Sequence, residues 1–278
     1  MILPVASVVT EKTICEFDLL KLSLEQYHNC QWVISCDTAA NEKYKDVENI
    51  KCLKLIKTDD CDHNHASEEQ KDNWMKVMMT KFDAVEELLK SYGHALFLDS
   101  DMIFVNPIED SVLSLFGNKN IDACICQHMT NDWPTEAKHG LYNGGMFHIK
   151  SENFVTQWKT LSTQYKKYGF YFEQQPLEFV QRNFNSFNLP INYNIGWWRF
   201  NRPTTQNRLN LLSVKDDKIY FGPKPAVNFH VHTLREIGYQ NFGQFLVDKI
   251  ASLMKLTNNE NYKELLSVLR ADNEVLGN

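Results

Sequence analysis

Short apolar runs alternate with amphipathic helical patterns through the first hundred residues, and no other feature constrains the fold as strongly. The runs have the length of strands and lie at residues 5–10, 31–36, 50–56 and 95–98. From about Glu68 to Ser91 apolar residues recur at helical spacing, and Gly93 follows as a helix terminator. Strands that are joined through helices run parallel and are covered on both faces. The sequence therefore predicts an α/β fold with a mixed, mostly parallel central sheet flanked by helices.

The second half of the chain is less regular. Its apolar runs predict strands at residues 121–127, 141–149 and 226–232. Helical patterns lie at about residues 151–168 and 175–184, and two amphipathic helices close the chain. No repeat, low-complexity tract or linker interrupts the 278 residues, of which 43% are hydrophobic. We therefore predict a single domain.

The charge and the cysteine content indicate which binding partners and which cellular compartment to expect. The formal net charge is −6, and no block of Lys and Arg offers a surface for a phosphate backbone, so we expect no nucleic-acid partner. No apolar run is long enough to span a bilayer, and the first ten residues are typical of a strand rather than a signal peptide. The seven cysteines show no C-x-x-C spacing, and no Asn-x-Ser/Thr site occurs. We expect a cytoplasmic protein, and nothing predicts its oligomeric state.

Two acidic residues, Asp99 and Asp101, lie between apolar runs. Burying a charge there without compensation costs several kcal/mol, and a divalent cation is the simplest compensation because hard cations prefer oxygen ligands. The alternative is a pair of strand-end carboxylates that cap the next turn. The spacing alone is not specific, since Asp60-Cys61-Asp62 repeats it in a polar stretch where we expect a solvated turn.

The segment Leu-Phe-Leu-Asp-Ser-Asp-Met-Ile-Phe-Val-Asn-Pro-Ile, at residues 96–108, resembles the metal-binding segment of GT-A fold glycosyltransferases. It is most similar to glycogenin-type and related nucleotide-diphospho-sugar transferases, and the resemblance extends over roughly residues 2–235. It implies that Asp99 and Asp101 hold Mn²⁺ or Mg²⁺, that the metal binds the diphosphate of the donor, and that Ser100 lies against the same cofactor. It also implies one GT-A catalytic domain, with a nucleotide-binding half, a donor-sugar and acceptor half, and C-terminal helices; these parts span 1–110, 111–240 and 241–278.

Two further segments resemble the donor-sugar site of that family. Asn143-Gly144-Gly145 is similar to its Asn-x-Gly strand, and glycines let a substrate approach the backbone while an amide bonds a hydroxyl. Glu173-Gln174 resembles its Asp-Gln segment, with Glu in place of Asp. We take Asn143, Glu173 and Gln174 as candidate catalytic residues and the two glycines as donor contacts. The alternatives are a tight bend before a strand and an acidic helix N-terminus.

Two histidines in the last predicted strand complete the implied metal site. Val227–Thr233 resembles the late strand that carries the family's histidine ligand, and alternation places His230 and His232 on one face. One of them can bind the metal while the other contacts phosphate or packs, and we favour His230 as the ligand. A structural role for a strand histidine is the alternative.

The remaining candidates are contacts of the nucleotide and the acceptor. Thr10 and Asp37 follow the first two strands at positions where such folds hold the nucleoside, and Lys81 lies on the long helix before the acidic pair. Cations that could neutralise a diphosphate are Arg199, Arg202 and Lys224. Trp197 and Trp198 could stack on an acceptor sugar or pack in the core. A strand-end Asp or a helix Lys can also be merely solvated.

The hypothesis is a metal-dependent hexosyl- or pentosyltransferase that moves a sugar from a nucleotide-diphosphate donor, UDP above all, to a saccharide hydroxyl. An inverting route would need a base such as Asp132, Glu136 or Glu173, and a retaining route needs none. One alternative is a haloacid-dehalogenase-like phosphatase with Asp99 as nucleophile, Asp101 as acid–base and metal ligands at 216–217. Against it, the phosphatase motif lies on the first strand of its fold, whereas here three predicted strands precede the one that ends at Asp99. The other alternative is a catalytically inactive sugar-nucleotide-binding protein.

Overall fold

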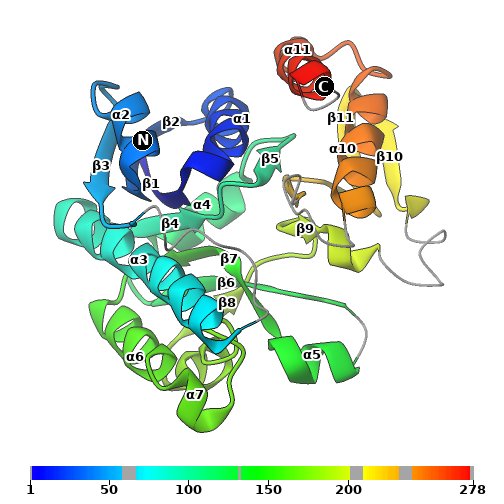
Figure 1. The fold of residues 1–278 in the computed structure, drawn as a ribbon. Coiled ribbons are helices and arrows are strands. Elements are labelled where there is room, and N and C mark those ends of the chain that lie inside the picture. Colours follow the sequence, from blue (N-terminus) through cyan, green and yellow to red (C-terminus); the bar gives the residue numbers. More distant parts are fainter. Residues whose placement is uncertain (1, 58–66, 131–132, 201–208, 232–239, 276–278) are drawn as a thin grey trace. The chain divides into compact units, whose positions relative to one another are not determined.

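A computed structural model describes residues 2–57, 67–130, 133–200, 209–231 and 240–275 (Figure 1). The chain forms two compact units, each built from several stretches of sequence. Unit 1 comprises residues 1–14, 29–100 and 109–189, and unit 2 comprises residues 15–28, 101–108 and 190–278. We describe each unit by itself.

Unit 1 is built on a central sheet that has seven strands among the described residues, in the order β3-β2-β1-β4-β7-β6-β8. The strands are β1 (Ile2–Val9), β2 (Asn29–Cys36), β3 (Ile50–Lys54), β4 (Ala95–Leu98), β6 (Ala123–Gln127), β7 (Tyr142–Ile149) and β8 (Ser186–Asn188). Every neighbouring pair is parallel except those that involve β7, which is antiparallel to both β4 and β6. The carboxyl ends of β1, β2, β4 and β6 therefore share one edge with the start of β7, and ligands of such sheets bind at this edge.

The helices of unit 1 pack on this sheet through a continuous core. They are η1 (Glu11–Thr13), α2 (Thr38–Tyr44), α3 (Glu68–Tyr92), α4 (Asp110–Gly117), α5 (Trp133–His139), α6 (Glu152–Ser162), α7 (Tyr165–Tyr168), α8 (Leu177–Val180) and η3 (Gln181–Asn183). A capping box of Ser67 and Gln70 starts α3, and Gly93 ends it in the left-handed conformation with φ 73°. Phe82 of α3 and Trp158 of α6 join the strand residues of one cluster, so both helices cover the same face.

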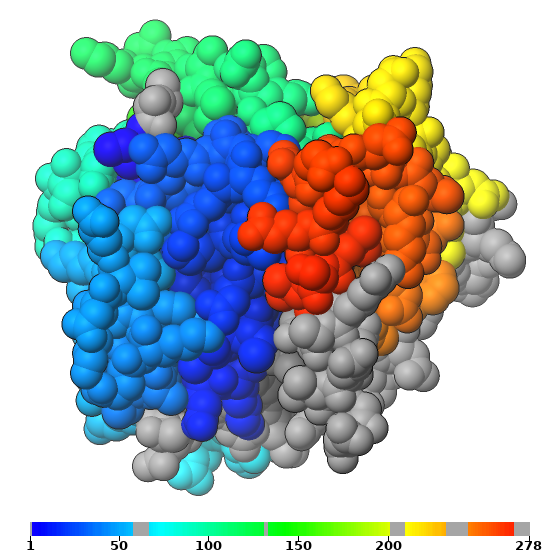
Figure 2. Space-filling view, turned by 90° about the horizontal axis from the view of Figure 1, so that it is seen from above, coloured from blue at the N-terminus to red at the C-terminus, as the bar shows by residue number. Residues whose placement is uncertain are grey.

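Unit 2 contains two small sheets and three helices among its described residues. One sheet has the order β5-β13-β9, formed by β5 (Met102–Phe104), β13 (Asn228–His230) and β9 (Ile195–Gly196), and η4 (Trp197–Arg199) follows β9. The other is a meander of β10 (Leu212–Lys215), β11 (Lys218–Phe221) and β12 (Lys224–Pro225). The helices are α1 (Ile14–Glu25), α10 (Gln240–Met254) and α11 (Glu260–Val275), and α10 and α11 lie side by side in both views (Figure 2).

The structure confirms the predicted α/β fold with a mostly parallel sheet, but two predicted helices are shorter. The helix expected at 151–168 is divided into α6 and α7, because Gln164 between them departs from helical backbone angles with φ −99° and ψ 15°. The helix expected at 175–184 becomes one turn of α8 and the 3₁₀ turn η3, and Phe184 is already extended. The meander of β10–β12 was not predicted. The assignment of a single catalytic domain stays a prediction.

No helix in the described part of the chain has both the length and the apolar character that crossing a membrane requires.

Candidate active site

A buried ion pair lies at the edge of the unit 1 sheet where the predicted site residues converge. Lys81 reaches from α3, and its Nζ lies 2.6 Å from Oε1 of Glu173 and 3.3 Å from the carbonyl oxygen of Gly144. The Lys81 and Glu173 side chains are 1% and 8% exposed. The ammonium also lies 4.9 Å from the centre of the Phe97 ring. The structure thus joins three residues that sequence analysis had nominated separately.

The charge state of Lys81 follows from its neighbours. Burial alone lowers the pKa of a lysine, because the charged form loses its hydration. The carboxylates of Glu173 and Asp99 more than offset this effect, and the pKa of Lys81 is raised above its ordinary value. The ammonium is therefore protonated at any physiological pH, and a fixed positive charge lies beside the start of β7.

Gly144 packs closely against this ion pair. A Cβ atom at this position would lie 3.2 Å from Oε1 of Glu173 and 3.6 Å from Nζ of Lys81. The backbone can approach the ion pair because no side chain intervenes. The predicted reason for a glycine was approach of a substrate, and the structure adds a second one, because a Cβ here would press the Glu173 carboxylate out of place by a few tenths of an ångström.

Amide side chains surround the same strand start. Asn143 accepts from the N–H of Gly145 through Oδ1, at 2.9 Å, and donates from Nδ2 to Oε1 of Gln174, at 3.3 Å. Gln174 Oε1 also accepts from the N–H of Gly144, and its Nε2 donates to the carbonyl of His139 at 2.8 Å. The predicted catalytic residues Asn143 and Gln174 are therefore directly bonded to each other.

His128 belongs to this cluster, although sequence analysis did not nominate it. Its Nε2 lies 3.2 Å from Nδ2 of Asn143, and its Nδ1 lies 2.7 Å from the carbonyl oxygen of Gly140. The residue is 7% exposed and follows directly after β6. Ligands of such sheets bind at the carboxyl ends of the strands, and His128 follows one of these ends. Sequence analysis could have found it if it had predicted that β6 and β4 end at the same edge.

Asp99 is fixed at the end of β4 by a backbone bond. Its N–H donates to the carbonyl of Gly145 at 2.7 Å, which extends the β4–β7 pairing by one residue. Ser100 follows and is buried. Both predicted cofactor contacts thus come directly after a strand of four fully buried residues.

In unit 2, Asp101 and His230 form a close pair. Nε2 of His230 lies 2.9 Å from Oδ1 of Asp101, with side chains 1% and 12% exposed. The β5–β13 pairing brings them together, because His230 is opposite Met102 in the register. On its other side, Nδ1 of His230 lies 3.0 Å from Oδ1 of Asn194, and the Trp198 ring meets the imidazole edge-on at 5.1 Å between centres.

The contact with Asn194 assigns one of the two imidazole nitrogens. The amide oxygen accepts, so Nδ1 carries a hydrogen and donates it, and Nε2 is directed at the Asp101 carboxylate. Two electron-rich atoms 2.9 Å apart need a proton or a cation between them. An imidazole nitrogen and a carboxylate oxygen are also a normal donor set for a divalent metal, and a hydrogen bond to the outer nitrogen is the usual support. These residues therefore fit the metal that the resemblance implies.

Several nominated contacts already have structural partners. The Asp37 carboxylate, 1% exposed, accepts from the N–H groups of Ala40 and Glu11 at 2.9 and 2.7 Å, so it caps α2. Arg199 is buried and donates to the backbone carbonyls of Ile191 and Tyr193. These bonds favour structural roles for both side chains.

The other nominated residues are distributed over both units. Thr10 is buried after β1, and Lys224 is exposed in β12. Asp216 and Asp217, the metal ligands of the phosphatase alternative, form the β10–β11 turn with positive φ at both residues. The nominated residues that lie outside the described part of the chain are Asp60, Asp62, Asp132, Arg202 and His232.

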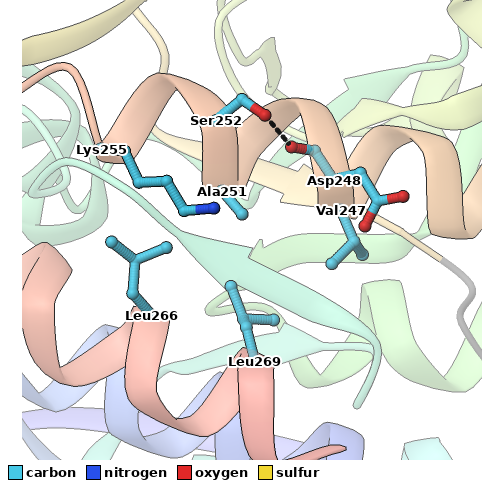
Figure 3. Close-up of a pocket in the computed structure, with 7 residues that line it drawn as sticks. All are labelled: Val247, Asp248, Ala251, Ser252, Lys255, Leu266 and Leu269. Carbon is cyan, nitrogen blue, oxygen red and sulfur yellow. Dashed lines mark hydrogen bonds between the residues drawn. The ribbon is translucent and has the colours of Figure 1, made fainter. Parts of the chain in front are cut away.

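A separate groove in unit 2 lies between α10 and α11. Val247, Ala251, Leu266 and Leu269 line it, and Asp248, Ser252 and Lys255 stand along its rim (Figure 3). Ser252 is bonded within α10 to the carbonyl of Asp248. This apolar groove carries none of the nominated residues, so the candidate sites are the sheet edge of unit 1 and, in unit 2, the Asp101–His230 pair.

A family model described as nucleotide-diphospho-sugar transferase matches residues 28–189. No curated protein sequence matches the chain. The apo form of the glycosyltransferase GlyE from Streptococcus pneumoniae TIGR4 is 13% identical with a TM-score of 0.59, and the match covers 98% of this chain and 64% of GlyE. The chain thus spans less than two thirds of that protein's length.

Two further solved structures cover most of their own chains. The galactosyltransferase LgtC, in complex with donor and acceptor sugar analogs, is 12% identical with a TM-score of 0.51, over 95% of this chain and all of LgtC. Mouse xyloside xylosyltransferase 1, in its apo form, is 10% identical with a TM-score of 0.51, over 84% of this chain and 98% of its own. At these identities the similarity shows the fold alone.

Proposed function

Because the chain belongs to the nucleotide-diphospho-sugar transferase family, we propose that it is a metal-dependent glycosyltransferase that moves a sugar from a UDP-sugar to a saccharide hydroxyl. The family match confirms the predicted resemblance, and the similar structures confirm the GT-A fold. The metal, the nucleotide, the transferred sugar and the acceptor are our proposals.

The Asp101–His230 pair is the observation that carries the metal assignment. Nδ1 of the imidazole is held by Asn194, and Nε2 faces a carboxylate oxygen at 2.9 Å, where a divalent cation could bind both atoms. Asp99 stands two residues before Asp101, so the chain itself keeps a second carboxylate within reach of the same cation. A bound Mn²⁺ or Mg²⁺ would act as a Lewis acid that offsets the charge on the departing diphosphate. We keep His232 as a further candidate ligand or phosphate contact.

The unit 1 cluster supplies fixed groups for the transferred sugar. Asn143 and Gln174 hold their amides in set orientations beside the strand start, and Glu173 is held by Lys81 at 2.6 Å. Amides and carboxylates of this kind bond sugar hydroxyls with defined direction and so orient the sugar for transfer. One LgtC structure is described as an active-site mutant in which Glu replaces Gln. We assign Gln174 as the active-site glutamine of this chain.

We assign the remaining candidates to the nucleotide. Thr10, Asp37 and Ser100 follow strands that end at the ligand edge of the sheet, where a nucleoside and its phosphates would lie. Lys224, being exposed and cationic, is our candidate for a phosphate contact from unit 2. Asp37, which already accepts from two backbone N–H groups, would contact the nucleoside while it holds the loop after β2.

Release of UDP and donor binding test the proposal together. Wild-type protein should show a thermal shift with a UDP-sugar that requires Mn²⁺, and should release UDP when a saccharide acceptor is added. Asp101→Asn should abolish the metal-dependent shift and lower turnover by at least about 100-fold, because it removes a metal ligand. Asp46→Asn, the same substitution at an exposed position of unit 1, is the matched control and should behave as wild type.

Three outcomes would contradict the proposal. Asp101→Asn could retain both the shift and turnover, which would exclude the metal site. The protein could release phosphate from a phosphomonoester and no UDP, which would indicate a phosphatase. Tight binding of metal and donor without hydrolysis or transfer, across a panel of UDP- and GDP-sugars and acceptors, would indicate a binding protein.

A further inference from the structure

His128 lies in a closed ring of hydrogen bonds that contains both candidate catalytic amides. From the carbonyl of Gly140 the ring passes to His128, then to Asn143, then to Gln174, and ends on the carbonyl of His139. His139 and Gly140 are consecutive, so the ring starts and ends on neighbouring peptide groups after α5. Every member lies in unit 1.

The partners of His128 define its protonation state. Nδ1 faces a carbonyl oxygen at 2.7 Å, so this nitrogen carries a hydrogen and donates it. Nε2 faces Nδ2 of Asn143, which can only donate, so Nε2 accepts with its lone pair. The ring therefore requires a neutral imidazole that is protonated at Nδ1.

The two amides are oriented by the same logic. The Asn143 oxygen accepts from the N–H of Gly145, and its nitrogen donates to His128 and to Gln174. The Gln174 oxygen accepts from Asn143 and from the N–H of Gly144, and its nitrogen donates to His139. Reversing either amide would place donor against donor or acceptor against acceptor at several contacts, so each orientation supports the other.

We propose that His128 is a positioning residue: its Nε2 lone pair fixes the amide of Asn143, and through Asn143 that of Gln174, in the orientation that binds the donor sugar. The inference rests on the proposed function of this site. A sugar hydroxyl distinguishes an amide nitrogen from an amide oxygen, so a turned amide loses one bond and gains a repulsive contact. His128 acts through Asn143 and Gln174.

Substitutions that keep or remove the acceptor atom test the proposal. His128→Leu removes both polar contacts, and His128→Gln can place an amide oxygen where Nε2 now accepts. We expect the Leu variant to lose about 10-fold or more in kcat/KM for the donor, and the Gln variant to stay within about 3-fold of wild type. His148→Leu, at a buried histidine near the opposite end of β7, is the matched control and should leave kcat/KM unchanged.

A double-substitution cycle separates positioning from a general loss of structure. If His128 acts through Gln174, then His128→Leu should cost less than about 3-fold in a Gln174→Ala background, because the group it positions is already absent. A loss as large as in the wild-type background would overturn the proposal. So would wild-type kinetics in the folded Leu variant.

A measurement on the resting protein makes the inference independent of turnover. ¹⁵N NMR of the labelled imidazole should show a neutral ring with its proton on Nδ1. A ring protonated at Nε2, or at both nitrogens at pH 7, would overturn the proposal even if transfer is observed. Conversely, a wild-type protein that transfers no sugar but shows the expected tautomer would contradict the proposed function and leave the ring of bonds confirmed.

Discussion

A pair of titratable side chains lies at each end of β7, with at least one member fully buried, and the two pairs differ in their charge. Beside the start of the strand, Lys81 and Glu173 form an ion pair 2.6 Å long. At the other end, Nε2 of His148 lies 3.0 Å from Nδ1 of His94, and the His148 ring stacks on Phe116 with centres 4.0 Å apart. One end of the strand thus keeps two charges in the interior.

The cause of the difference is the partner rather than the depth of burial, since Lys81 and His148 are both fully buried. Burial lowers the pKa of both, but the carboxylates near Lys81 reverse the effect. Around His148 the neighbours are His94 and Lys150, which add to the effect of burial, and its pKa lies well below its ordinary value. If buried polar side chains only had to satisfy each other's hydrogen bonds, a neutral pair would serve at both ends of the strand. The charged pair stands at the ligand edge of the sheet, where a fixed charge can act on a substrate.

Removing the cation from the charged end should produce the largest effect on stability. Lys81→Met retains the length of the side chain but leaves the Glu173 carboxylate buried without its ammonium. We expect a loss of about 3–5 kcal/mol in the free energy of unfolding at pH 7, because breaking one side of a buried pair leaves an uncompensated charge. Urea denaturation at pH 7 measures it.

The matched double substitution tests the cause. Lys81→Met combined with Glu173→Leu removes both charges and should recover most of the lost stability, since an apolar pair of similar volume is commonly neutral or better. A single Lys81→Met variant as stable as wild type would show that the ion pair does not organise this end of β7. The two ends would then be equivalent.

Sequence analysis predicted the sheet and the segments of the site better than the contacts within it. Asp99 was found because an apolar strand stops beside it at the ligand edge, and Asn143 and Glu173 because their segments resemble motifs of the family. That Lys81 pairs with Glu173 could not be predicted, since 92 residues separate them and only the packing of α3 decides it. Asn194 was missed because it belongs to no motif. His128 was missed because the alignment of β6 with β4, which brings it to the ligand edge, was not predicted.

Residue type also fails to distinguish a ligand contact from a structural one. Asp37 and Arg199 had the chemistry and position expected of nucleotide contacts, and the structure places both against backbone groups. A carboxylate at a strand end serves equally as a helix cap, and a guanidinium serves equally to bind carbonyl oxygens. Only the geometry of the neighbouring backbone separates the two uses.

A smaller effect is expected from a methyl group beside the ion pair. Gly144→Ala places a Cβ 3.2 Å from Oε1 of Glu173, so the pair or the strand must shift. We expect a cost of about 1–3 kcal/mol in the free energy of unfolding, together with a fall in donor turnover. Gly117→Ala is the control, because a Cβ there meets no atom within 4 Å and the residue ends a helix with an ordinary φ. If the two variants lose the same free energy of unfolding, the close contact between Gly144 and Glu173 does not explain why glycine occupies this position.

The smallest effect on stability at neutral pH is expected from the histidine pair at the other end of β7. Its effect should appear as a dependence of the free energy of unfolding on pH. The pKa of His148 is lowered in the folded protein, so the unfolded chain binds more protons once the pH falls below the ordinary value of 6.5. Its contribution is therefore complete above pH 6.5 and is lost progressively as the pH falls from there toward the lowered pKa. The slope approaches about 1.4 kcal/mol per pH unit for one histidine.

His148→Leu should remove that slope whatever it costs at pH 7. Urea denaturation of the wild type and the variant at several pH values between 7.5 and 5 measures it, and the two stabilities should converge as the pH falls. The Lys81→Met/Glu173→Leu variant, which carries neither charge of the ion pair, is the control and should show the wild-type slope. Parallel curves for the wild type and His148→Leu would mean that His148 becomes protonated in place, and the contrast between the two ends of β7 would then be one of position alone.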